Sequence, residues 1–134
     1  MKPIDPVKRV FIVDDSPIVR ERLASLVAEI PQVQLVGEAE IAFEAINRIQ
    51  SLKPDVVILD ISMPGGSGMH VLEAIKKDPS PPCVIMLTNF AYDQYREKCA
   101  QLGADHFFDK SGEFERVSDI ISQLPPRAGR TPAK

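Results

Sequence analysis

Five side chains that together could carry out one kind of chemistry are spread along the sequence of 134 residues. Two adjacent carboxylates, Asp14 and Asp15, and a third, Asp60, each follow a short apolar run. A hydroxyl group, Thr88, and an ammonium group, Lys110, end two later runs. A single aspartate after a strand is most often a turn or helix-capping residue. The joint occurrence of these groups at strand ends is what indicates a site.

Three carboxylates in one place need a compensating charge. Two like charges about 4 Å apart repel by about 4 kcal/mol at an effective dielectric constant of about 20. Either one carboxyl group keeps its proton or a divalent cation lies between them. Oxygen-only ligands favour Mg²⁺ over a zinc or a caged calcium site. The sequence contains no EF-hand loop, HExxH motif or P-loop. Mg²⁺ and an ammonium group beside a carboxylate form a site for a phosphoryl group, in which one carboxylate can be the nucleophile.

The elements that must position these residues alternate between two hydrophobic patterns. Continuous, β-branched-rich runs are typical of strands buried on both faces of a parallel sheet. Between them, apolar residues recur at helical spacing. The strands are expected at 10–13, 33–36, 56–59 and 84–87, with a weaker one at 106–108, and the helices around 23–30, 42–49, 72–75, 92–102 and 114–124. The spacing between successive strand ends, near residues 14, 37, 60, 88 and 110, fits one strand, one helix and two short loops. The pattern predicts an α/β fold.

Turn residues agree with this division of the chain. Ser16 and Pro17 have the order of a helix N-cap and first helical residue, and Gly103 stands where a helix C-cap belongs. The glycine-rich segment 65–68 lacks the spacing to a P-loop lysine, so we expect a flexible turn into the third helix.

Composition limits the class of protein. A hydrophobic fraction of 44% and a charged fraction of 26% are those of a globular domain, and the length fits one domain. The net charge of −3 disfavours nucleic-acid binding through a general positive field. No apolar run approaches the roughly 20 residues that span a bilayer, and the N-terminus lacks a signal-peptide apolar region. We expect Cys83 and Cys99 to be buried thiols and the protein to be soluble and intracellular.

The ends of the strands decide where a ligand would bind. Parallel connections are right-handed, so helices on both faces require the strand order to reverse, and ligands bind beyond the carboxyl ends at that reversal. All five candidate residues are expected at this edge. With their flanking segments, residues 13–16, 54–61 and 63–68, they resemble the receiver domain of two-component response regulators.

The resemblance covers residues 8–124 and implies a single doubly wound, flavodoxin-like (βα)5 three-layer sandwich with parallel strand order 2-1-3-4-5. Residues 1–7 would be an N-terminal extension and residues 125–134 a flexible C-terminal tail. It also implies a cytoplasmic phosphorelay protein with no membrane insertion and no direct contact of this domain with nucleic acid. Whether the chain is a stand-alone regulator or one domain of a longer protein stays open.

The resemblance also assigns roles at the site. Asp60 would accept a phosphoryl group from a sensor histidine kinase or a histidine phosphotransfer protein. Asp15, Asp60 and the backbone carbonyl of Ser62 would bind Mg²⁺ directly, and Asp14 would hold it through water. Lys110 would pair with the phosphoryl group. The only reactions implied are self-catalysed phosphoryl acceptance and hydrolysis of the aspartyl phosphate, so the domain is a signalling module and not an enzyme.

The output would pass through two further positions. Thr88 would move toward the phosphoryl group, and Phe107, at the aromatic switch position, would change its rotamer. The signal would reach an unknown protein target through the face formed by the fourth helix, fifth strand and fifth helix. Phe107 lacks the hydroxyl of the common tyrosine, so its switching would rest on packing. Ser111 follows Lys110, where many receivers have a proline after a cis peptide bond, and Asn89 follows Thr88, where a smaller residue is common.

Two other functions are compatible with parts of this pattern. The first is an enzyme with an aspartyl-phosphate intermediate, such as a phosphatase. Its typical DxD pair ends the first strand, whereas here the two aspartates at that strand end are adjacent. The second is a degenerate receiver that acts only as a docking domain, which the presence of all five site residues disfavours.

Overall fold

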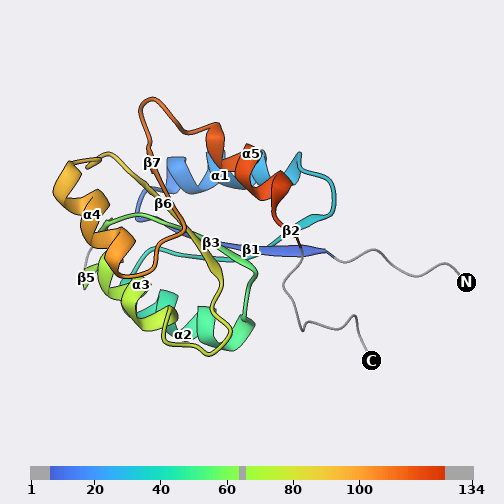
Figure 1. The fold of residues 1–134 in the computed structure, drawn as a ribbon. Coiled ribbons are helices and arrows are strands. Elements are labelled where there is room, and N and C mark those ends of the chain that lie inside the picture. Colours follow the sequence, from blue (N-terminus) through green and yellow to red (C-terminus); the bar gives the residue numbers. More distant parts are fainter. Residues whose placement is uncertain (1–6, 64–65, 126–134) are drawn as a thin grey trace, which may run out of the picture.

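The structure, a computed structural model, describes residues 7–63 and 66–125, and its centre is a parallel five-stranded sheet in the order β2-β1-β3-β6-β7 (Figure 1). In chain order these are strands 2-1-3-4-5 of the sheet, so the predicted doubly wound topology is confirmed. The elements are β1 (Lys8–Val13), α1 (Pro17–Ala28), β2 (Val33–Ala39), α2 (Ala42–Leu52), β3 (Val56–Leu59), β4 (Ser62–Met63), β5 (Gly66–Ser67), α3 (Gly68–Ile75), β6 (Cys83–Thr88), α4 (Asp93–Gln101), β7 (His106–Asp109) and α5 (Arg116–Gln123).

The helices form a layer on each face of the sheet. Helices α1 and α5 lie on one face, and α2, α3 and α4 lie on the other (Figure 1). Two hydrophobic clusters correspond to these layers, and the strands contribute alternate residues to each, such as Val10 and Ile12 to one and Phe11 and Val13 to the other. Burial on both faces explains why the strands are continuous apolar runs.

The register of the central strands brings the first and third strand ends together. Val13 of β1 pairs with Leu59 of β3, and the Asp60 N–H donates to the carbonyl of Val13 over 3.0 Å. The next residue after each strand is therefore an aspartate at the same height in the sheet, Asp14 beside Asp60.

The predicted helix caps are present. The Ser16 hydroxyl accepts a hydrogen bond from the Val19 N–H over 3.3 Å at the start of α1, and Pro17 is the first helical residue. Gly103 follows α4 with a φ of 101°, a left-handed conformation that favours glycine.

Several element boundaries differ from the prediction, among them the starts of α4 and α5. Tyr92 precedes α4 as its N-cap, and Phe114 lies before the start of α5 at Arg116, although Phe114 is buried. The spacing of apolar residues shows which residues are buried, not which are helical. A buried residue in the turn before a helix can therefore extend the apolar pattern beyond the helix itself. Cys99 is buried as expected, but Cys83 is only half-buried.

The glycine-rich segment after β3 is more ordered than expected. Ser62–Met63 and Gly66–Ser67 pair as two short antiparallel strands, so the expected flexible turn is wrong for residues 66–67, while residues 64–65 lie outside the described part of the chain. Gly68 then begins α3. A Cβ atom on Gly68 would lie 1.7 Å from the backbone oxygen of Asp60, so only glycine fits here.

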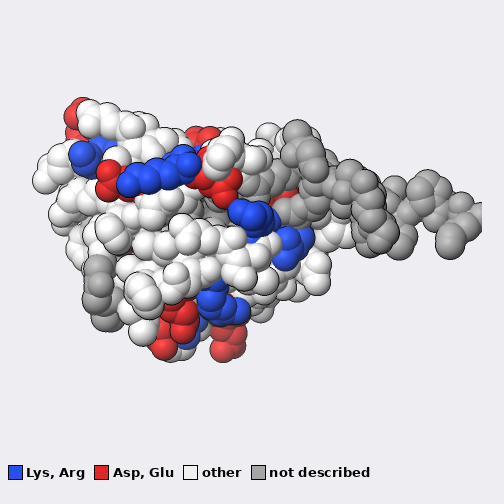
Figure 2. Space-filling view, turned by 90° about the horizontal axis from the view of Figure 1, so that it is seen from below, with Lys and Arg blue, Asp and Glu red and all other residues white. Residues whose placement is uncertain are grey.

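The surface carries charges of both signs. On the face seen in Figure 2, lysine and arginine side chains lie among aspartate and glutamate side chains, without an extended field of one sign. Among the described residues, no helix has the length and apolar character needed to cross a membrane. Of the predicted N-terminal extension and C-terminal tail, only Val7 and Pro125 belong to the described residues.

Candidate functional site

The site lies at the carboxyl edge of the sheet, where three strand ends meet. Asp14 follows β1, Asp60 follows β3 and Lys110 follows β7. The Lys110 N–H donates to the backbone carbonyl of Thr88 over 2.9 Å, which connects the ends of β7 and β6. No peptide bond in the described residues is cis, and the bond between Lys110 and Ser111 is trans.

The structure brings together three carboxylates and one ammonium group. One carboxylate oxygen each of Asp14, Asp15 and Asp60 lies within 4.8 Å of the others. Lys110 Nζ lies 2.7 Å from Asp14 Oδ2 and 3.1 Å from Asp60 Oδ2. Asp14 and Asp60 are buried, whereas Asp15 is exposed. Three negative charges thus face one positive charge, which leaves an excess negative charge at the edge of the sheet.

Burial and charge act in opposite directions on the two central groups. Burial raises the pKa of the Asp60 carboxyl above its usual range; the Lys110 charge opposes this rise and the Asp14 charge adds to it. Burial alone would lower the pKa of Lys110, but its hydrogen bonds to, and charge attraction by, Asp14 and Asp60 raise it overall. Lys110 therefore remains a cation at neutral pH.

The residues at this site fit a divalent cation. Among the described residues, Asp60 Oδ1 is buried and has no hydrogen-bond partner. A buried oxygen without a partner destabilises the fold unless a ligand or ion binds it. It belongs to a cluster of carboxylates, the donor type that Mg²⁺ prefers. Ser62, the other expected ligand, is exposed in β4, two residues after Asp60.

The two positions expected to switch differ in their surroundings. Thr88 is fully buried, and its hydroxyl oxygen accepts a hydrogen bond from the Phe90 N–H over 3.0 Å. Within the described residues the Thr88 O–H donates to no partner, so its proton can be donated to a ligand. Phe107 is partly buried against the hydrophobic cluster under α2, α3 and α4, and the guanidinium of Arg96 lies over its ring.

A hollow of about 360 Å³ lies next to the site. It opens between the short strands β4 and β5 and the start of α4, and most of its lining is apolar. The lining residues are Ile61, Ser62, Met63, Ser67, Met69, Phe90 and Tyr95. The hollow borders the segment that follows Asp60, so a change in that segment would alter its shape.

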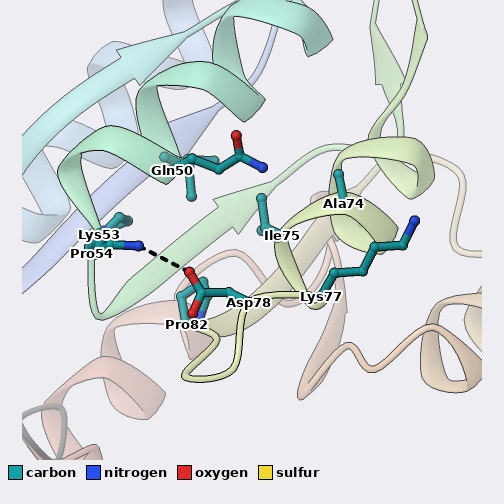
Figure 3. Close-up of a pocket in the computed structure, with 9 residues that line it drawn as sticks. Gln50, Lys53, Pro54, Ala74, Ile75, Lys77, Asp78 and Pro82 are labelled. Atoms are coloured by element: carbon teal, nitrogen blue, oxygen red, sulfur yellow. Dashed lines mark hydrogen bonds and ion pairs between the residues drawn. The ribbon is translucent and has the colours of Figure 1, made fainter.

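A second hollow, of about 330 Å³, lies at the opposite edge of the sheet and has no part in this site (Figure 3). It lies between the C-terminal ends of α2 and α3, where Pro54 and Pro82 lead into β3 and β6. An ion pair of 3.2 Å between Lys53 and Asp78 spans it (Figure 3). None of the site residues predicted from the sequence lines this hollow.

Two residues that the sequence analysis did not consider contact the site. Arg20 of α1 donates to the backbone carbonyl of Asp14 over 2.7 Å, and Phe90 contacts the Thr88 hydroxyl through its N–H. The position of Arg20, four residues after the helix cap Ser16, places it one turn into α1, facing the strand end. The sequence offers only that spacing as a signal, and it does not show that Arg20 contacts the Asp14 carbonyl.

Comparison with known proteins gives a consistent result. Residues 10–122 match the family model described as response regulator receiver domain. The chain is 36% identical over 121 residues to a sensory transduction protein, LytT, of Enterococcus faecalis, covering 90% of this chain and 49% of that protein. It is 40% identical over 118 residues to a protein-glutamate methylesterase/protein-glutamine glutaminase of Carboxydothermus hydrogenoformans, covering 87% of this chain and 34% of that protein. The chain thus spans half or less of these relatives.

Solved structures agree with the sequence relatives. The response regulator domain of Thermotoga maritima CheB superimposes with a TM-score of 0.78 at 29% identity, covering 90% of this chain and 99% of that chain. A CheX-CheY-BeF3-Mg complex from Borrelia burgdorferi contains a chain with a TM-score of 0.74 at 26% identity, covering 85% of this chain and 89% of that chain.

Proposed function

This chain belongs to the family of response regulator receiver domains, and we propose that it accepts a phosphoryl group on Asp60 from a histidine kinase or a histidine phosphotransfer protein. The observation that carries the proposal is the state of the Asp60 carboxylate. Lys110 holds Oδ2 at 3.1 Å, while Oδ1 is buried without a hydrogen-bond partner among the described residues. One oxygen is thus oriented by a cation and the other is left for a ligand.

The transfer exchanges one phosphorus bond for another. A carboxylate oxygen of Asp60 attacks the phosphorus atom of a phosphohistidine, the P–N bond breaks, and its electron pair returns to the imidazole. The product is a mixed anhydride on Asp60, and water later hydrolyses it to the carboxylate and inorganic phosphate. Lys110, already at the carboxylate, neutralises a phosphoryl oxygen as the group arrives.

The acidic cluster would hold the metal ion that this chemistry requires. Asp15, Asp60 and the Ser62 carbonyl would bind Mg²⁺ directly, and Asp14, which is engaged by Lys110, would act through water. When bound, Mg²⁺ supplies positive charge to the oxygens of the transferred group. A related structure is described as a complex with BeF3 and Mg, which supports this assignment.

The phosphorylated domain would signal through its surface. We propose that the Thr88 hydroxyl donates to the phosphoryl group, and that Phe107 repacks as the start of α4 adjusts. The target would be a protein that binds the face of α4, β7 and α5. From its membership of this family we propose that the domain signals in the cytoplasm. Because the surface seen in Figure 2 has no extended positive field, we also propose that this domain makes no direct contact with nucleic acid.

Labelling with a small phosphodonor tests the proposal. The chain is incubated with acetyl phosphate and Mg²⁺, and the modified residue is mapped by mass spectrometry. We expect one phosphoryl group per chain, labile to hydroxylamine, on Asp60, and no label on Asp60→Asn. Asp109→Asn is the matched control, because its carboxylate binds Ser111 and lies outside the cluster. Labelling of Asp60→Asn at the wild-type level would show that Asp60 is not the acceptor.

A further inference from the structure

Each polar group of Asp14 has a hydrogen-bond or ion-pair partner. Its N–H donates to the Ala39 carbonyl over 3.1 Å, and its Oδ1 accepts from the Ser16 N–H over 2.9 Å. Its Oδ2 pairs with Lys110, and its backbone carbonyl accepts from Arg20 Nη1 over 2.7 Å. Arg20 is the only one of these partners that contributes a side chain from the helix layer on the face of α1.

Asp15 has no such support of its own. It is exposed, and within the described part of the chain its carboxylate has no hydrogen bond or ion pair, although it belongs to the acidic cluster. Its position depends on the peptide plane that joins it to Asp14. The carbonyl of that peptide is the group that Arg20 holds, so the contact at Asp14 determines where the Asp15 side chain begins.

Arg20 is itself fixed from a third element. Its Nε lies 3.3 Å from Glu38 Oε1, and its Nη1 lies 3.8 Å from Glu40 Oε2. The Arg20 side chain is only 18% exposed. One guanidinium therefore joins α1, the end of β1 and the end of β2, and its planar set of donors can serve a carbonyl and a carboxylate together.

We propose that Arg20 is a positioning residue for the metal site, and that it sets the affinity for Mg²⁺ by fixing the peptide between Asp14 and Asp15. This inference rests on the proposed function. It assigns to Arg20 a part in metal binding although Arg20 is a cation and touches none of the three carboxylate oxygens of the cluster. Outer partners of metal ligands typically change metal affinity by about 10- to 100-fold when they are replaced.

The sign of the effect separates positioning from simple charge. If the Arg20 charge alone mattered, its removal would leave the cluster more negative, and Arg20→Met would bind Mg²⁺ more tightly. If Arg20 acts by positioning, Arg20→Met binds Mg²⁺ about tenfold more weakly. Arg20→Lys keeps the charge but lacks the planar set of donors, so it should also bind more weakly, by a smaller factor.

A Mg²⁺ titration followed by the backbone amide shifts of Asp15 and Ser16 in ¹H–¹⁵N NMR spectra gives the dissociation constant of each variant without phosphorylation. Arg22→Met is the matched control on the same helix, because the Arg22 guanidinium lies over the ring of Phe114, 3.8 Å from its centroid. It should bind Mg²⁺ as the wild type does. If Arg20→Met does not fold, Arg20→Lys carries the test, because it keeps the positive charge and removes only the planar set of donors.

Each result supports or overturns a separate statement. Unchanged or tighter Mg²⁺ binding in Arg20→Met, with wild-type binding in Arg20→Lys, overturns the role of Arg20 while leaving the metal site intact. If the wild type shows no Mg²⁺-dependent shift at Asp15, or if Asp15→Asn binds equally well, the metal site of the proposed function is wrong.

Discussion

The guanidinium of Arg96 lies over the ring of Phe107, with its central carbon 4.6 Å from the ring centroid. Arg96 Nη1 also donates to the Phe107 backbone carbonyl over 3.2 Å. Helix α4 is thereby joined to β7 at the position expected to change rotamer. A phenylalanine has no hydroxyl that could form a hydrogen bond and fix its ring. The cation–π contact with Arg96 restrains the ring instead.

Replacing Arg96 by Gln should allow the Phe107 side chain to adopt a second rotamer. A cation–π contact at an exposed site contributes about 0.5–1 kcal/mol, so the free energy of unfolding should fall by no more than about 1 kcal/mol. The aromatic ¹H–¹³C signals of Phe107 should shift and broaden as the ring samples a second rotamer. Lys98→Gln, an exposed change on the same helix, serves as the control. Unaltered Phe107 signals in Arg96→Gln would show that the contact does not hold the ring.

Thr88→Ala should separate phosphorylation from its output. Lys110 and the carboxylates are untouched, so labelling of Asp60 should persist. The phosphorylation-dependent shift changes on α4, β7 and α5 should be mostly lost, because no hydroxyl remains to donate to the phosphoryl group. Thr88→Ser should restore them. If NMR shows the changes intact in Thr88→Ala, or confined to α1 and α2 in the wild type, the proposed route is wrong.

The size of that response should be limited. Moving a population from 1:99 to 99:1 takes about 5.5 kcal/mol. One hydrogen bond to a charged group contributes about 1.5–3 kcal/mol. Phosphorylation alone should therefore give only a partial shift, seen as signals between the two end states, and binding of the target should complete it.

Gly68→Ala should destabilise the domain. Its Cβ would lie 1.7 Å from the Asp60 carbonyl oxygen, and backbone cannot give way as a flexible side chain can. We expect a loss of about 1–3 kcal/mol in the free energy of unfolding, measured with denaturant. Gly112→Ala is the control, because a Cβ there meets nothing within 4 Å, and its stability should be unchanged or slightly higher. Equal stabilities of the two variants would contradict the close approach.

Asp60→Asn should be more stable than the wild type at neutral pH. Burial raises the pKa of Asp60 in the folded state, so the stability that its proton provides is present below the ordinary carboxyl pKa and is lost as the pH rises through the raised value. Once the pH exceeds the raised pKa, the ionised Asp60 lowers the stability of the wild type, by about 1.4 kcal/mol for each unit of the rise. Asparagine carries no charge and avoids this loss.

Denaturant unfolding of both proteins between pH 4 and pH 8, without Mg²⁺, measures the effect. The advantage of Asp60→Asn should grow with pH and nearly vanish at the acidic end. Added Mg²⁺ should stabilise the wild type more than the variant, because the variant loses one carboxylate of the cluster. An Asp60→Asn protein that is less stable at pH 7 would show that the pairing of Asp60 with Lys110 outweighs its burial.

The sequence by itself determined the sheet and the position of the acidic cluster. Buried strands appear as continuous apolar runs, and the carboxyl ends of parallel strands meet at one edge, so Asp14, Asp60 and Lys110 could be placed together without coordinates. Apolar spacing also identified the helices, since each must bury one face.

Only the tertiary structure decided which side chains contact the cluster and the positions expected to switch. The contact of Arg20 with the Asp14 carbonyl depends on how α1 lies on β1, and that of Arg96 with Phe107 depends on how α4 lies on β7. The need for glycine at position 68 arises from the close approach of α3 to Asp60. Hydrophobic periodicity specifies which face of a helix is buried. It does not specify the position and angle at which that helix packs, and these decide which polar groups meet.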